Sequence, residues 1–451
     1  MEFIRSMPDS DKSKMILGAF MQASNCSNYA ASWRHPDTAS DFLSIEYFKR
    51  IAEILEKGNF HFAFIDDRLA MPGTLNNSIS DTVTHGIRTI KFDLIPIVMG
   101  MAMSTTHLGI GATYSTTYHH PFHIARLFAT LDHMTNGRVG WNVVTSLNDE
   151  EAKNFGLESH LNHDERYDQA DEIMQAVTGL WDTWGDDAII ADKANGLFAN
   201  QDKVKTLNYK GRYVSSKGPL TVPRSPQGHP VIMQAGQSEK GKEFAAKWGE
   251  VIFAIFKNKQ EGKAIVNDIK SRAVKYGRDP KSIKVVTAAY VIPASSNEEA
   301  ENKKSFIESL AKPEDKLALL SELLNFDLRS LPEDHIVTKE DLNKMSGARF
   351  PIEQLIQKKE NFTLGDMVKF SNRGTINELP TFHGTPQKIA EDMSDWYRSG
   401  SCDGFMIAAT HIPGSYSDFV ELIVPELQKM GTIRKEHCGH TLRESLGFNR
   451  P

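Results

Sequence analysis

The chain contains very little cysteine, with three residues (Cys26, Cys402 and Cys438) in a length of 451. Cysteines this few and this far apart form neither a disulfide framework nor the closely spaced ligand pairs of a zinc site. The first fourteen residues, MEFIRSMPDSDKSK, are polar and lack the apolar core of a secretory signal. These absences argue against a disulfide-rich secreted protein, and we expect the chain to work in the cytoplasm.

Long hydrophobic runs and an excess of positive charge are also missing. The longest apolar stretches, such as 94–103, are far too short to span a bilayer. Lysine and arginine number 52 against 58 aspartate and glutamate, which gives a net charge of −6 and no electrostatic reason to bind nucleic acid. We therefore expect a globular protein without a membrane span and without a nucleic-acid partner.

Several catalytic signatures are absent as well. The chain has no G-x-G-x-x-G turn after an early strand, no complete nucleotide-binding P-loop and no G-x-S-x-G elbow. His119, His120 and His123 resemble a metal cluster, but Pro121 interrupts them and no acidic ligand stands at a suitable spacing. We therefore expect no metal site.

Short apolar strands alternate with amphipathic helices along the chain. The predicted strands are 15–20, 60–65, two within 108–146, 230–235, 251–254, 283–292 and 404–408. Eight strands alternating with helices predict a parallel (β/α)8 TIM barrel. An open doubly wound sheet is the alternative, but it would favour the glycine-rich turn that this chain lacks.

The whole chain, 1–451, is predicted to form a single barrel domain with two insertions. Residues 183–229 break the alternation with several glycines and prolines, and residues 311–380 are charged and irregular. We expect the second insertion to cover the functional site.

Polar side chains gather where the predicted strands end. Thr113 to Thr117 follow one strand, Asn142 belongs to the end of the next, and Asp66 and Asp67 follow strand 60–65. Active sites of parallel barrels lie at the carboxyl ends of the strands, so these residues predict one wall of a site. Helix capping is the alternative interpretation for the aspartates.

Two further segments suit a ligand that carries a planar ring and an anion. His163 and Tyr167 are one helical turn apart and therefore share a face, although simple exposure to solvent is the alternative. The turn GQSEKG, which contains Ser238, follows a predicted strand and precedes a helix. Free N–H groups and the helix dipole at such a turn favour a phosphate.

Long motifs carry a family resemblance. WRHPD, FIDD, ATYSTTYHHPFHIARLFATLDHMTNGRVGWNVVTS, HDERYDQADE, SPQGHPVIMQAGQSEKGKEFAAKWGEVIF and HTLRESLGF occur in this order. From about residue 15 to 447 the chain resembles the bacterial-luciferase-like flavin monooxygenases, in the group of nitrilotriacetate monooxygenase component A, dibenzothiophene-sulfone monooxygenase and long-chain alkane monooxygenase. The resemblance implies a luciferase-like barrel that binds FMN, supplied as FMNH2 by a separate NAD(P)H:flavin reductase, with O2 as co-substrate.

The resemblance also implies which residues bind the cofactor. The matching positions are Asp67, Thr113, Asn142, His163, Tyr167 and, at the phosphate, Ser238. Relatives usually have a small residue where this chain has Asp66, which leaves open which of the two carboxylates faces the ring. No catalytic acid or base is implied. His35 and Thr117 are weak candidates for steadying the flavin C4a-(hydro)peroxide that transfers oxygen in this family.

The implied substrate is a small organic molecule cleaved next to sulfur or nitrogen, as in a sulfone or an aminocarboxylate. Leu147-Asn148-Asp149 follows WNVVTS as in sulfone-cleaving relatives, and Ser24 and Ser27 stand where the alkane enzyme has cysteine and histidine. The alternatives are a long-chain alkane hydroxylase and a non-catalytic flavin- or F420-binding relative. The family resemblance further suggests a homodimer or a homotetramer.

Overall fold

The structure is a computed structural model that describes residues 14–72, 79–347, 356 and 359–451. The polar N-terminal segment and part of the second predicted insertion lie outside these residues. Within the described ranges, none of the helices combines the length and the apolar character that a membrane crossing requires.

Eight parallel strands close into a barrel. In order around the ring they are β1 (Ile16–Gln22), β2 (Phe62–Asp66), β3 (Gly109–Ser115), β4 (Val139–Val144), β9 (Val231–Gln234), β10 (Val251–Ala254), β11 (Lys284–Pro293) and β13 (Gly404–Ala408). β10 pairs with both β9 and β11, and β13 pairs with both β11 and β1, so the ring is complete. The predicted TIM barrel is confirmed. One further strand, β12 (Thr381–Gly384), lies beside the end of β11.

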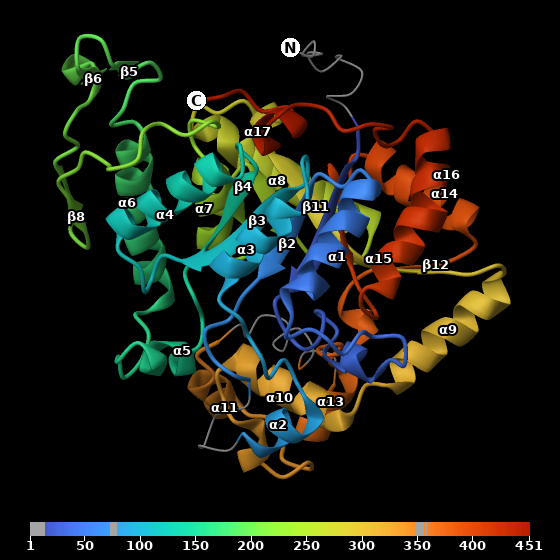
Figure 1. Cartoon of the computed structure of the whole chain (residues 1–451). Helices are drawn as coiled ribbons and strands as arrows, with labels where there is room; N and C mark the ends of the chain where they lie inside the picture. Colours follow the sequence, from blue (N-terminus) through green and yellow to red (C-terminus); the bar gives the residue numbers. More distant parts are fainter. Residues whose placement is uncertain (1–13, 73–78, 348–355, 357–358) are drawn as a thin grey trace.

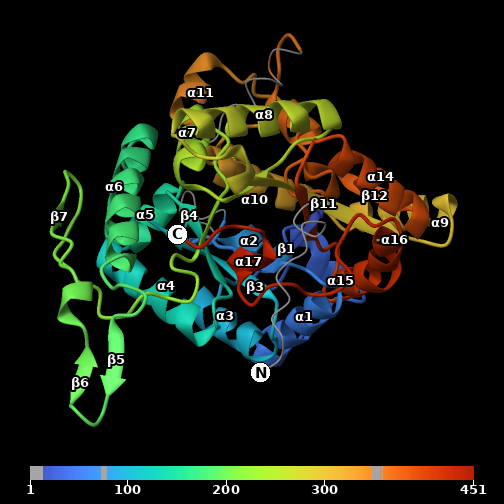
Figure 2. The ribbon, with the colours of Figure 1, turned by 90° about the horizontal axis from the view of Figure 1, so that it is seen from above.

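Helices surround the strands (Figure 2). They are α1 (Ile45–Lys57), α3 (Leu94–Met103), α4 (Pro121–Met134), α6 (His163–Trp181), α7 (Glu239–Trp248), α8 (Lys259–Lys275), α14 (Pro386–Arg398), α15 (Gly414–Asp418) and α16 (Val424–Lys429). Their starts follow sequence signals. Ser44 caps α1 by accepting from the Glu46 N–H, and Thr385 caps α14, where Pro386 occupies the first turn.

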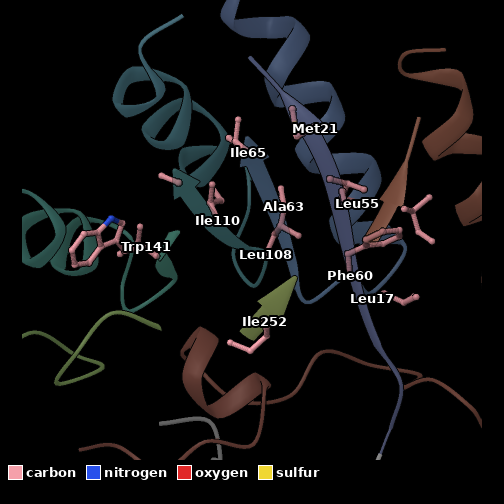
Figure 3. Packing of buried hydrophobic residues seen from close by; sticks show 14 of the residues in the cluster. Leu17, Met21, Leu55, Phe60, Ala63, Ile65, Leu108, Ile110, Trp141 and Ile252 are labelled. Atoms are coloured by element: carbon pink, nitrogen blue, oxygen red, sulfur yellow. The ribbon is translucent and has the colours of Figure 1, made fainter. Parts of the chain in front are cut away.

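The alternation of side chains along the strands creates two separate cores. Outward-facing residues such as Ile110 and Trp141 are buried between the barrel and its helices (Figure 3). Inward-facing Phe20, Phe64 and Phe253 fill the barrel, with ring centroids 4.8–5.9 Å apart. The interior is therefore a packed core, and any ligand must bind above it.

The two ends of the barrel are covered differently (Figure 1). The short helix α17 (Leu442–Ser445) and the C-terminal tail pack under the amino ends of the strands. At the carboxyl ends lie α2 (Ser80–His85), α5 (Asp149–Asn154), α10 (Pro313–Leu324), α11 (Lys339–Lys344) and α13 (Leu364–Phe370). Helix α5 follows β4 at a place where our sequence analysis predicted no helix. Its capping box, built from Asn148 and Glu151, is a signal that the sequence carried.

The two predicted insertions lie in different places. Residues 183–229 form two small hairpins, β5 (Ile189–Asp192) with β6 (Leu197–Ala199) and β7 (Tyr209–Lys210) with β8 (Ser215–Ser216). Both project away from the barrel beside α6, whereas α10, α11 and α13 lie across the strand ends after the long helix α9 (Asn297–Ser309) (Figure 1). The division into one barrel domain with two insertions remains our proposal.

A buried ion pair ties the segment that contains α10, α11 and α13, which we call the covering segment, to the barrel. Arg34, at the end of the 3-10 turn after β1, donates from its two Nη atoms to the two carboxylate oxygens of Asp315 at 2.6 and 2.9 Å. The Asp315 side chain is fully buried. The same guanidinium also donates to the carbonyl oxygens of Leu310 and His85. One side chain thus joins the loop after β1, the end of α2 and the approach to α10.

Replacing Asp315 should destabilise the protein strongly. Asp315→Ala leaves the Arg34 guanidinium buried without its carboxylate, so we expect a loss of about 3 kcal/mol in the free energy of unfolding, measured in urea. Asp41 and Arg50 form a similar two-oxygen pair with both side chains more than 40% exposed, and Asp41→Ala should cost less than about 1 kcal/mol. Equal losses in the two variants would contradict a special role for the buried pair.

Candidate functional site

A cavity of about 670 Å³ lies at the carboxyl ends of β2, β3 and β4. The loop after β2, the loop before α3 and helix α5 provide the rest of its wall. Polar lining residues include Asp67, Arg68, Lys91 and Thr113, while Phe155 contributes an aromatic ring. Two of the six residues predicted to bind a cofactor, Asp67 and Thr113, thus lie on this wall.

Thr113 and Asn142 form a hydrogen-bonded pair across neighbouring strands. Asn142 Nδ2 donates to Thr113 Oγ1 at 2.8 Å, and the threonine hydroxyl in turn donates to the Ile65 carbonyl oxygen at 2.8 Å. Asn142 is 1% exposed, yet its Oδ1 has no hydrogen-bond partner among the described residues. A buried acceptor without a donor is costly, so this oxygen is suited to a ligand that carries an N–H or O–H group.

The two consecutive aspartates face different surroundings. Asp66 is the last residue of β2, shares the inward side of the strand with Phe64, and accepts from Gln22 Nε2 at 3.3 Å. Asp67 lines the cavity and accepts from the Arg68 N–H at 2.8 Å. Burial raises the pKa of Asp67 to about 7; the positive charge of Lys91 opposes this shift. Asp67 is therefore the carboxyl group on the cavity wall.

Tyr167 lies against the GQSEKG turn. A Cβ atom on Gly236 would lie 2.6 Å from the tyrosine hydroxyl oxygen, and one on Gly241 would lie 2.9 Å from it. Only glycine leaves room at these two positions. Ser238 caps α7, since its Oγ accepts from the Gly241 N–H at 3.0 Å. The tyrosine hydroxyl, the serine hydroxyl and the start of α7 together form a cradle whose donors suit an anion.

His163 occupies the outer edge of this cradle. Its ring centroid is 5.1 Å from that of Tyr167, and its Nδ1 lies 2.9 Å from an Asp164 carboxylate oxygen. The side chain is 46% exposed. The predicted pair on one helix face is therefore present, with the tyrosine inside and the histidine at the surface.

Arg166 is a candidate that our sequence analysis missed. It directly precedes Tyr167 in the sequence and lies on the same side of α6. Its side chain is 6% exposed and donates no hydrogen bond to any residue within the described ranges. Burial lowers the pKa of its guanidinium. The signal was its spacing, because an arginine three residues after His163 falls on the face that carries Tyr167. Arg166 therefore provides a positive charge near the cradle.

The two weak catalytic candidates lie away from the cavity wall. The His35 ring stacks on His411 at 4.2 Å between centroids, with 11° between the ring planes, and Phe306 contacts its edge. Thr117 donates from its hydroxyl to the Thr145 carbonyl oxygen at 2.7 Å. Neither residue lines the cavity. Both contact neighbouring loops, and their catalytic roles stay predictions.

Neither histidine group has the geometry of a metal site. His119 Nδ1 bonds to the Ser115 carbonyl oxygen, and His120 caps α4. His35, Asp37 and His411 offer atoms within 4.8 Å of one another. The lone pairs of an imidazole lie in the ring plane, and two parallel stacked rings direct them side by side rather than toward one ion.

A closed parallel barrel with a polar cavity and a glycine-rich turn at the carboxyl ends of its strands is the architecture of the TIM-barrel enzymes. Residues 24–402 match the model of the luciferase-like monooxygenases. The chain belongs to this family, as its motifs predicted, and it is a monooxygenase.

Similarity to known proteins extends over nearly the whole chain. It is 40% identical to the dibenzothiophene-sulfone monooxygenase of Rhodococcus erythropolis over 444 residues, or 97% of both chains. The crystal structure of a long-chain alkane monooxygenase matches with a TM-score of 0.86 and 34% identity, covering 96% of this chain and 95% of the other. A riboflavin lyase with modified FMN matches with a TM-score of 0.87 and 29% identity, covering 97% and 96%.

The raised pKa of Asp67 predicts a pH-dependent stability difference. The folded protein keeps this proton up to about pH 7, whereas the unfolded chain releases it near pH 3.8, so Asp67 lowers stability progressively as the pH rises between these values. Relative to wild type, Asp67→Asn should therefore gain about 2–4 kcal/mol from pH 4 to 7.5. Urea unfolding at a series of pH values measures the difference. Asp41→Asn, at an exposed site, should run parallel to wild type; parallel curves for Asp67→Asn would refute the assignment.

Proposed function

We propose that this protein is the oxygenase component of a two-component, FMN-dependent monooxygenase. It would take FMNH2 from a separate NAD(P)H:flavin reductase and use O2 to oxygenate a small organic substrate. The observation that carries the proposal is the unpartnered Asn142 Oδ1 above the barrel core, together with the glycine-lined cradle of Tyr167 and Ser238. The Asn142 oxygen suits a ring with N–H donors, and the cradle suits a phosphate.

The residues present fit FMN at both ends. At the phosphate, Ser238 would donate its hydroxyl proton, Tyr167 its phenolic proton, and Arg166 would supply positive charge, with His163 at the outer edge. At the ring, Asn142 would accept a hydrogen bond, supported by Thr113. When bound as FMNH2, the cofactor supplies the reaction with O2 and the transfer of one oxygen atom.

The chain's own contribution is to exclude water and to hold a proton. The covering segment, anchored through Arg34 and Asp315, lies across the strand ends without lining the cavity, and there it would limit the access of water to a bound flavin. Asp67, with a pKa of about 7, holds a proton on its carboxyl group over much of the neutral range. In that form it would donate a hydrogen bond to the ring or to the substrate.

We propose a substrate cleaved next to sulfur or nitrogen, sulfone-like or aminocarboxylate-like. Support comes from the 40% identity to a protein named dibenzothiophene-sulfone monooxygenase and from Leu147-Asn148-Asp149 after β4. Alkane hydroxylation, the alternative, has less support because Ser24 and Ser27 replace the cysteine and histidine expected of an alkane enzyme.

We also propose a homodimer or homotetramer that works in the cytoplasm. Large apolar side chains on and beside α1 and α3 are exposed, including Leu43 (71%) and Met103 (82%), and contact with a second copy would bury them. Analytical ultracentrifugation tests the assembly, and a monomer at micromolar concentration would contradict it.

The proposed function predicts incorporation of one atom of molecular oxygen. The purified protein with a flavin reductase, NADH, FMN and 18O2 should convert a member of a sulfone and aminocarboxylate panel to a product carrying one 18O atom, detected by mass spectrometry. Omitting the reductase is the control. Product from long-chain alkanes alone would favour the alkane alternative. Tight binding of oxidised flavin or F420, without product from any compound, would favour the non-catalytic one.

Ser238→Ala should weaken FMN binding. The loss of one charge-assisted hydrogen bond to the phosphate predicts a decrease of about 1–2 kcal/mol in binding free energy, measured by quenching of flavin fluorescence. The substitution also removes the cap of α7, so Ser296→Ala is the matched control. Ser296 caps α9 through the same contact, with the Glu299 N–H donating to its Oγ at 3.1 Å. Unchanged FMN affinity in Ser238→Ala would remove Ser238 from the phosphate site.

A further inference from the structure

Two cationic side chains line the cavity without a carboxylate partner. The Arg68 guanidinium makes no hydrogen bond and no ion pair with any residue that the structure describes, although it is on the cavity wall. Lys91 Nζ donates to Gln22 Oε1 at 2.7 Å and, within the same ranges, reaches no carboxylate oxygen. Arg68 comes from the loop after β2 and Lys91 from the loop before α3, so two segments present positive charge to one space.

A third cation lies behind them. Arg88 is 6% exposed, and its side chain donates to the Asn28 carbonyl oxygen, while its Nε has no acceptor among the described residues. Burial lowers the pKa of Lys91, and the like charge of Arg88 lowers it further. The positive charge at this part of the wall is therefore not the property of a single side chain.

The carboxylates of the cavity wall already have donors. Asp67 accepts from the Arg68 N–H, Asp93 caps α3 by accepting from the Ile95 N–H at 2.9 Å, and Glu151 accepts from the N–H groups of Leu69, Leu147 and Asn148 at 3.0–3.3 Å. Asp66 bonds to Gln22. Against the effect of burial, Asp66, Glu322, Glu151 and Asp67 all raise the pKa of Arg68, and none of them forms an ion pair with it. Arg68 and Lys91 are therefore the cationic groups of this wall whose donors are not bonded to a carboxylate within the described residues.

We propose that Arg68 and Lys91 bind an oxyanion group of the substrate, a carboxylate or a sulfonate. A guanidinium presents a planar fork of donors that matches the two oxygens of such a group, and an ammonium adds a second charge. The rest of the wall includes the apolar side chains of Leu69, Phe92 and Phe155, which suit a short hydrophobic body. The proposal rests on the proposed function and narrows it, because it selects anionic substrates over neutral sulfones.

A matched pair of probes separates charge from shape. Benzenesulfonate and methyl phenyl sulfone have similar size, but only the first is an anion. Titration calorimetry on the FMN-loaded protein should show benzenesulfonate binding at least about tenfold more tightly. Arg68→Gln and Lys91→Gln should each remove most of this preference and leave sulfone binding unchanged. Arg126→Gln, on the exposed side of α4, is the control and should keep the wild-type preference.

The same experiment distinguishes failure of this proposal from failure of the proposed function. FMN affinity is measured first; if the wild-type protein does not bind FMN, the function is wrong, and a loss of the probe preference in Arg68→Gln but not in Ser238→Ala, both flavin-free, still tests the anion site. Equal affinity for the two probes, or no measurable binding of benzenesulfonate, would overturn the proposal. So would an Arg68→Gln variant that keeps the probe preference but loses FMN affinity, because the cation would then serve the cofactor.

Discussion

Closure of the barrel through the pairing of β10 with β11 is the constraint on which the site depends. All eight strands are parallel, so closure brings their carboxyl ends to a single rim. Asp67, Thr113, Asn142 and the turn at Ser238 are far apart in the chain and follow or end four different strands. The helix that carries Tyr167 lies against this turn because α6 packs beside α7, the helix that follows the turn. Each element has an ordinary local cause, and only ring closure makes them neighbours.

Several polar groups at the rim have no partner among the described residues. Asn142 Oδ1 and Arg166 Nε are buried without partners in the described part of the chain, and the Arg68 guanidinium lines the cavity without an ion pair there. A fold gains no stability from a buried group of this kind, because it loses contact with water without a replacement. We interpret the groups at the rim as stability given up for binding.

The sequence allowed the barrel and most of the candidate rim to be predicted. Strand ends, helix caps and the glycine turn are local patterns, and the structure shows caps with such signals at Ser44 and Thr385. The inward orientation of Asp66 could also have been predicted. Side chains alternate along a strand, and Asp66 is two positions after Phe64, which faces inward. The roles of the site residues themselves stay predictions.

Other features depended on three-dimensional position. Whether Arg68 or Arg166 has a carboxylate partner is decided by segments distant in the chain, and no local pattern contains that information. The surroundings of His35 were hidden for the same reason, because its stacking partner His411 follows the last barrel strand. Helix α5 was not predicted, although its capping box is visible in the sequence, because the helix is only six residues long.

Excluding water and solvating charge are opposing requirements at this site. The proposed flavin chemistry requires that water be excluded, yet Arg68 and Lys91 keep positive charge on the cavity wall. Removing water from cations that have no ion-pair partner is costly. A substrate that brings its own oxyanion replaces the lost water with charge-assisted hydrogen bonds. The cavity can then be dry and electrostatically satisfied at the same time, and this holds only with the substrate in place.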